Sequence, residues 1–259
     1  MVTTVISLHS LLSIRQGDGA LAVGAKPSAP SRARVRKKIV QEHRREHEDP
    51  LSIDWDRFAI SGTCNKLEKA YFRLTSAPDP STVRPAPVLR KALARLVNLI
   101  ASGDVNYFYS QDQFKGMRQD CVVQALKGDL PIAIYEAHAR AALEYGDTAE
   151  YNQCQGQLRG LYTPKTRKAE FIAYRILYQS VFWFLNRNKG EIVVGLLESL
   201  GDAEGVTNTE NVAHALEVRQ ALVSSNYAAF FRLYDCAPAL GRALMDLAVP
   251  KLRFACLEG

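Results

Sequence analysis

The sequence lacks the motifs of the common catalytic classes. It contains no glycine-rich dinucleotide or phosphate loop, no GxSxG nucleophile turn and no HExxH zinc motif. Its carboxylates fall mostly at positions typical of solvated helix faces. We therefore expect a protein that is not an enzyme and that needs no cofactor.

Cysteine is scarce and scattered. No CxxC pair occurs and no histidine lies at metal-ligand spacing from a cysteine, so we expect no metal site. An odd number of single cysteines is typical of reduced thiols in a reducing compartment. Cys154 falls on an apolar helical face and is expected to be a small core residue. The five cysteines are Cys64, Cys121, Cys154, Cys236 and Cys256.

A long hydrophobic run is also missing. The best candidate, AYRILYQSVFWFL, is shorter than the roughly 20 residues that cross a bilayer, and it contains Arg175 and Gln179. We expect no contact with a membrane. The first forty residues contain a single acid, Asp18, and have no basic leading region, which argues against a secretory signal. A mitochondrial transit peptide stays open beside a nuclear or cytoplasmic location.

The composition changes near residue 50. Residues 1–50 are polar, charged and poor in large apolar side chains, so we expect a disordered basic arm there and a folded domain over residues 51–259. The net charge of +6 suits an anionic partner. A basic cluster in the arm is interpreted either as a phosphate-binding or nuclear localisation signal or as a solvated tail. It consists of Arg32, Arg34, Arg36, Lys37 and Lys38.

Beyond the arm, apolar residues recur at helical spacing. From Pro87, leucines fall three and four residues apart with basic residues off that stripe, and Asp147 with Glu150 forms a sequence like a capping box. Small-residue turns separate the helices at uneven intervals. The pattern predicts an all-α stack of helix pairs, similar to a tetratricopeptide array but without its strict period. The expected helices are 87–100, 106–126, 131–145, 147–161, 168–186, 191–200, 210–224, 227–236 and 240–248.

A second basic cluster lies at the start of the folded part. Its first three members recur at helical spacing near Tyr71 and Phe72, so a basic patch there would position RNA through its phosphates. A solvated face with ordinary core aromatics is the alternative. The candidates for nucleic-acid binding in this part are Lys66, Lys69, Arg73, Arg84, Arg90 and Lys91.

Other polar residues have structural interpretations. The proline-rich loop SAPDPSTVRP either presents Asp79 and Arg84 to a partner or locks one helix against the next. His138 is expected to be a hydrogen-bonded structural histidine, because the sequence shows no convergent partners for it. Arg118 and Asp120 are expected to pair with each other or with a neighbouring helix.

Four strings in this part resemble a known family. They are KLEKAYFRLTSAPDPSTVRP, QFKGMRQD, YEAHARAALEYGD and EYNQCQGQLRGLY, between Lys66 and Tyr162. They are similar to the GANP-type PCI family, and most to the branch that contains leukocyte receptor cluster member 8 and the yeast Thp-type protein. The resemblance implies a right-handed helical repeat that forms the helical half of a PCI module. In the family the module continues into a winged helix, which the resemblance implies is missing from a chain that ends at Gly259.

The resemblance also implies a role. It points to a non-enzymatic scaffold in transcription-coupled mRNA processing, splicing and export in the nucleus. Its partners would be a second PCI-domain protein, a Dss/Sem-type acidic peptide and RNA. A PCI subunit of a proteasome lid or of a translation-initiation assembly shares the same scaffold and is the alternative.

Overall fold

The computed structural model describes residues 59–163, 168–186 and 209–258, and within these ranges it contains helices and no strand. The predicted all-α helical repeat is confirmed. Two compact units divide the chain, Met1–Ile60 and Ser61–Gly259, and the elements below belong to the second. The arm expected over residues 1–50 lies outside the described residues. The elements are η3 (Pro80–Thr82), α2 (Ala86–Ser102), α3 (Tyr107–Val123), α4 (Asp129–Glu144), α5 (Thr148–Leu161), α6 (Ala169–Leu185), α8 (Glu210–Val223), α9 (Tyr227–Asp235), α10 (Ala239–Asp246) and α11 (Val249–Glu258).

The helices follow the apolar spacing closely. Each predicted helix within the described ranges is present, with ends that agree within a few residues. The helix expected over residues 191–200 lies outside those ranges. Helix α11 was not among the expected helices, and it contains Pro250 in its first turn. Proline is tolerated in the first turn of a helix, where its missing N–H needs no partner, and α11 uses it there.

Side-chain caps fix the start of several helices. Asn106 Oδ1 accepts a hydrogen bond from the Tyr109 backbone N–H at 2.9 Å, and Asp147 Oδ1 accepts one from the Glu150 N–H at 2.9 Å. The capping box expected at Asp147 is therefore half formed. The Glu150 carboxylate does not return to the cap but turns toward α3, where it takes part in the candidate site.

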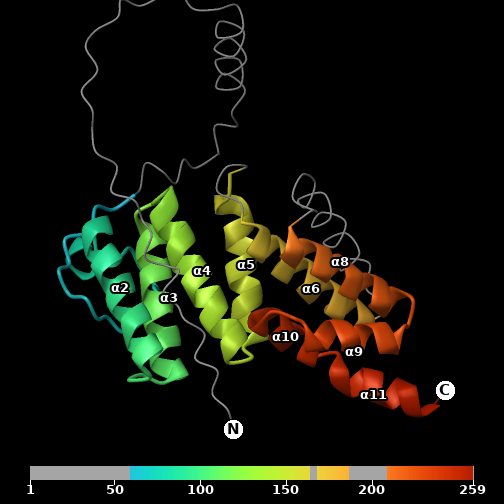
Figure 1. Cartoon of the computed structure of the whole chain (residues 1–259). Helices are drawn as coiled ribbons and strands as arrows, with labels where there is room; N and C mark the ends of the chain where they lie inside the picture. The colour runs from blue at the N-terminus through green and yellow to red at the C-terminus, as the bar shows by residue number, and fades with distance from the viewer. Residues whose placement is uncertain (1–58, 164–167, 187–208, 259) are drawn as a thin grey trace, which may run out of the picture. The chain divides into compact units, whose positions relative to one another are not determined.

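Helix α4 is the centre of the first half of the fold. It packs against α2, α3, α5 and α10, and its side chains are buried on nearly every face. Figure 1 shows it between α3 and α5. A helix that is apolar all round is expected to lie inside a domain. Four buried alanines, Ala137, Ala139, Ala141 and Ala142, allow the neighbouring helices to approach closely.

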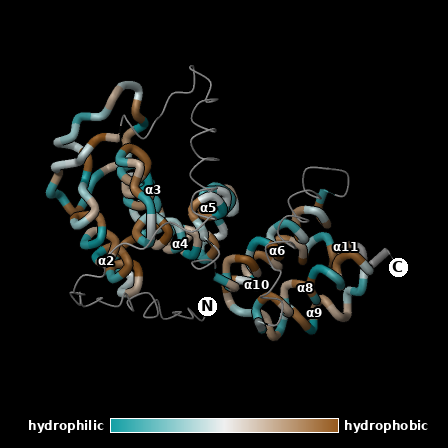
Figure 2. The backbone as a smooth tube through the Cα atoms, turned by 90° about the horizontal axis from the view of Figure 1, so that it is seen from above, coloured by the Kyte–Doolittle hydropathy of each residue, from teal (hydrophilic) through white to brown (hydrophobic). Residues whose placement is uncertain are grey.

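The later helices continue the same core. Helix α6 packs against α8 and α10, and α8 packs against α9. Phe184, Phe230 and Leu244 are fully buried among them. Hydrophobic and hydrophilic residues both occur along these helices (Figure 2), and most of the apolar side chains of α6 are buried. No helix in the described part of the chain is long and apolar enough to span a bilayer.

Residues 61–79 form an extended segment rather than a helix. The helical spacing of Lys66, Lys69 and Arg73 therefore does not correspond to a helix. The backbone groups of the segment pair instead with side chains of α3: the Lys69 N–H donates to Gln113 Oε1 at 3.1 Å, and Gln119 Nε2 donates to the Phe72 carbonyl at 2.9 Å. Side-chain amides thus take the place of a neighbouring strand.

The start of the extended segment is fixed by close packing. A Cβ atom at Gly62 would lie 2.3 Å from the Val83 carbonyl oxygen, so only glycine fits there. The Gly62 N–H donates to Gln124 Oε1 at 3.2 Å, and Gln124 Nε2 donates to the Arg84 carbonyl at 2.8 Å. One glutamine therefore joins both the start of the segment and Arg84, just before α2, to the C-terminal end of α3.

Candidate nucleic-acid interface

A buried ion-pair network holds the extended segment to α3. Asp120, itself 1% exposed, receives the Arg84 Nε at 2.6 Å and the Lys69 Nζ at 2.7 Å. Arg84 also donates from Nη1 to the Leu67 carbonyl at 3.2 Å. The loop therefore locks against a helix, which was one of the two roles expected for it. Asp79 caps η3, where its Oδ1 accepts from the Ser81 N–H at 2.9 Å.

Arg84 was predicted to contact phosphates, and this prediction is wrong. Its side chain is 0% exposed, so no phosphate reaches it. Lys69 is largely committed to Asp120, with a fifth of its side chain exposed. The sequence could not distinguish these two cations from their neighbours, because their partner Asp120 is far along the chain.

The other basic candidates of the folded part lie on the surface. Lys66, Arg73, Arg90 and Lys91 are exposed. An ion pair between Arg95 of α2 and Glu68 of the extended segment joins the two elements that carry them. The arm cluster, Arg32, Arg34, Arg36, Lys37 and Lys38, lies outside the described residues.

A groove of about 750 Å³ opens between the extended segment, α3 and α5. Three cations line it, Arg73, Lys115 and Arg118, and one carboxylate, Glu150. The apolar part of its wall includes Val122, which is 66% exposed. The groove was not predicted, because it forms where three elements distant in sequence meet.

Glu150 orders two of the three cations. Its Oε2 lies 3.0 Å from Lys115 Nζ, and its Oε1 lies 2.6 Å from Arg118 Nη2. Arg118 also stacks over the Tyr135 ring, with 5.5 Å between the guanidinium carbon and the ring centroid. The expectation that Arg118 pairs with a neighbouring helix is confirmed, since Glu150 belongs to α5.

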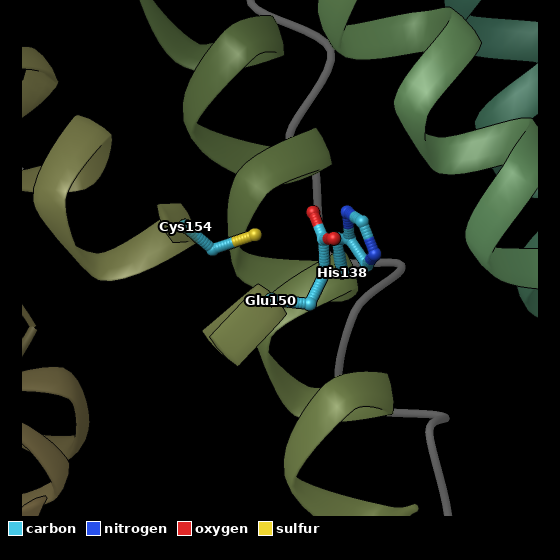
Figure 3. A group of neighbouring side chains, drawn as sticks. All are labelled: His138, Glu150 and Cys154. Carbon is cyan, nitrogen blue, oxygen red and sulfur yellow. The ribbon is translucent and has the colours of Figure 1, made fainter. Parts of the chain in front are cut away.

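Beneath the groove, Glu150 meets two further buried side chains. The donor atoms of His138, Glu150 and Cys154 lie within 4.8 Å of one another, and Figure 3 shows that the residues come from two adjacent helices, α4 and α5. These are residue types that bind zinc. The Arg118 guanidinium, however, lies 3.0 Å from Cys154 Sγ as well as 2.6 Å from Glu150. The positive charge beside these three residues is therefore supplied by the Arg118 guanidinium, at the place where a metal ion would otherwise bind.

The protonation states of the cluster agree with that arrangement. Burial, together with the positive charges of Arg118 and Lys115, lowers the pKa of His138 to about 2. Burial raises the pKa of the Cys154 thiol to about 11, against the opposite effect of Arg118. The cluster thus holds a neutral imidazole and a neutral thiol, and its one carboxylate is balanced by two cations. Cys154 is a buried core residue, as expected.

His138 differs from its expected role. It is fully buried and stacks on Phe114, with 4.8 Å between ring centroids, but neither ring nitrogen has a hydrogen-bond partner. Glu150 and Cys154 do converge on it in space. The sequence gave no sign of this, because the three residues lie on two helices whose register is set only by packing.

The fold and the groove together define a class of protein. In the part of the chain that the structure describes, this is an α-helical repeat with an open groove that carries a surplus of positive charge. Residues 62–259 match the SAC3/GANP family, and the chain belongs to that family.

Relatives in plants, fungi and animals support the assignment. The chain is 44% identical over 208 residues to SAC3 family protein A of Arabidopsis thaliana, which covers 80% of this chain and 20% of that protein. It is 46% identical over 208 residues to a THP3 homolog of Schizosaccharomyces pombe, and the match covers 79% of this chain and 50% of that protein. It is 38% identical over 231 residues to a leukocyte receptor cluster member 8 homolog of Xenopus laevis, and the match covers 88% of this chain and 28% of that protein. The chain thus spans a fifth to a half of these relatives.

Proposed function

We propose that this protein is a non-enzymatic scaffold in nuclear mRNA processing and export, which binds RNA and a second PCI-domain protein. The observation that carries the proposal is the match of residues 62–259 to the SAC3/GANP family, a family associated with mRNA processing and export. The helical repeat supports it physically, because stacked helix pairs offer extended surfaces for partners. A Dss/Sem-type acidic peptide is the third proposed component.

The partner proposal is tested by affinity purification. The tagged chain is expressed in cells and recovered from nuclear extract, and the bound proteins are identified by mass spectrometry. We expect a second PCI-domain protein together with a small acidic peptide of the Dss/Sem type. Recovery of proteasome-lid or translation-initiation subunits alone would overturn the mRNA assignment. Recovery from cytoplasmic or mitochondrial extract alone would overturn the nuclear one.

The arm is tested by neutralising its basic cluster. Replacing Arg32, Arg34, Arg36, Lys37 and Lys38 with glutamine is expected to weaken RNA binding and to flatten its dependence on salt, because each phosphate contact with single-stranded RNA contributes about 0.7 to the slope of log K against log salt. Fluorescence anisotropy over a salt series measures both quantities. An unchanged affinity and slope would show that the arm is a solvated tail.

A further inference from the structure

We propose that the groove between the extended segment and helices α3 and α5 binds single-stranded RNA, with a base stacked on Tyr71 and a phosphate held by Arg73 and Lys115. The inference rests on the proposed RNA binding and assigns it to a particular site. It adds Tyr71 and Lys115, which the basic patterns of the sequence do not indicate as phosphate or base contacts.

Charge selects an anionic occupant. Three cations and one carboxylate line the groove, so a surplus of two positive charges faces it. Lys115 has 29% of its side chain exposed, and an ammonium group carries three donors, so pairing with Glu150 leaves it able to bind a phosphate. Arg73 is exposed at the rim. Contacts of this kind bind RNA without reading its sequence.

Aromatic and amide groups favour RNA over an acidic peptide. Tyr71 lines the groove with 37% of its surface exposed, and Phe72, the next residue, is 73% exposed. Bases stack on exposed rings, whereas a peptide carboxylate gains nothing from a ring face. On the opposite wall, Gln153 and Gln157 lie one helical turn apart, and each amide offers a donor and an acceptor to a base edge.

The extended segment holds these groups in place before RNA binds. The Tyr71 N–H donates to Asp112 Oδ1 at 3.1 Å, and the Phe72 carbonyl accepts from Gln119 at 2.9 Å. The backbone on both sides of the stacking ring is therefore fixed to α3. A rigid site loses less conformational freedom on binding, which increases affinity.

The test uses the full chain and fluorescent oligouridylate and oligoadenylate of about ten nucleotides, a length that one groove of this kind accommodates. Tyr71→Ala is expected to weaken binding about 5-fold or more, whereas Tyr71→Phe retains the ring and the affinity. Arg73→Gln is expected to lower the salt slope by about 0.7, whereas Arg73→Lys retains it. Arg253→Gln removes one exposed charge on α11, outside the groove and outside the basic candidates, and serves as the matched surface control. Ultraviolet crosslinking of the oligouridylate should label Tyr71 or Phe72.

The outcomes separate this inference from the proposed function. If the wild-type chain binds no RNA, both are overturned. If it binds RNA but Tyr71→Ala and Arg73→Gln behave like the Arg253→Gln control, and crosslinks fall elsewhere, the groove is not the site and the proposed function stands. If a short peptide of aspartate and leucine binds in a manner sensitive to both groove variants while RNA binding is insensitive to them, the groove is a protein-docking site and the inference is wrong.

Discussion

Replacing Asp120 with asparagine is expected to lower the free energy of unfolding by about 3–5 kcal/mol. The carboxylate is buried and pairs with Arg84, which is completely buried, and with Lys69. Removing its charge leaves the Arg84 guanidinium inside the protein with no counter-charge. Desolvation of an unpaired charge is the dominant cost, so the loss exceeds that of a hydrogen bond alone. Urea denaturation followed by circular dichroism measures it.

A surface ion pair provides the control. Glu68→Gln removes a partner of Arg95 at positions where both side chains are about half exposed, and it is expected to cost less than about 1 kcal/mol.

A second variant removes both charges of the buried pair. Arg84→Met combined with Asp120→Leu should recover part of the stability lost in Asp120→Asn, because no buried charge stays unpaired. A cost for Asp120→Asn no larger than for Glu68→Gln would contradict the buried network.

The same variant affects the groove. Asp120 anchors the segment that carries Tyr71, and Arg84 Nη2 lies against Gly116 on α3, where an added Cβ would be 3.3 Å from it. When the anchor is lost, the ring and Arg73 lose their fixed position. Hydrogen exchange at the Tyr71 amide should therefore accelerate more than exchange in α4, because local opening precedes global unfolding.

The sequence predicted the helices well because their signals are local. Apolar spacing, Pro87 and the cap at Asp147 each act within one or two turns, and the corresponding helices form where expected. Residues 66–73 show the opposite case. Their spacing is helical, but the amides of Gln113 and Gln119 satisfy an extended backbone across some forty residues of chain. Tertiary contacts of this kind overrule local propensity and leave no pattern in the segment itself.

The candidate site was predictable only in part. Arg73 was identified by its charge, and its exposure agrees with that role. Arg84 has the same charge and was identified by the same reasoning, yet it is buried. Nothing in QFKGMRQD marks Lys115 as a groove residue, because that role depends on Glu150 and the extended segment, which are distant in sequence. Charge is visible in a sequence, whereas burial depends on which helix lies opposite, and that decides whether a cation binds a phosphate or an internal carboxylate.

Lowering the pH from 6.5 to 4.5 is expected to destabilise the protein by about 2 kcal/mol through His138 alone. The pKa of this imidazole is about 2 in the folded protein and about 6.5 in the unfolded chain. Below pH 6.5 His138 becomes protonated in the unfolded chain but stays neutral in the folded protein. The stability from this group is therefore complete well above pH 6.5 and is lost as the pH falls toward 2, with a slope that approaches about 1.4 kcal/mol per pH unit below pH 6.

The surroundings of His138 explain why its pKa is lowered in the folded protein. The ring stacks on Phe114, and neither nitrogen has a hydrogen-bond partner to share the charge. Lys115 and Arg118 from α3 repel a positive charge there. Glu150 from α5 attracts it, but this carboxylate is already paired with both cations. Burial and two like charges therefore outweigh one shared carboxylate.

A pair of variants isolates the contribution of His138 from the other acids that titrate in this range. His138→Phe keeps an aromatic ring but cannot be protonated, so its free energy of unfolding should fall less steeply between pH 6.5 and 4.5 than that of the wild type. Phe114→Leu loosens the same contact without removing a titrating group, and it should lower stability while the acid-dependent loss persists. Urea titrations at several pH values provide the slopes. Parallel curves for wild type and His138→Phe would mean that the folded state accepts the proton, which requires the imidazole to reach Glu150 in place of Arg118.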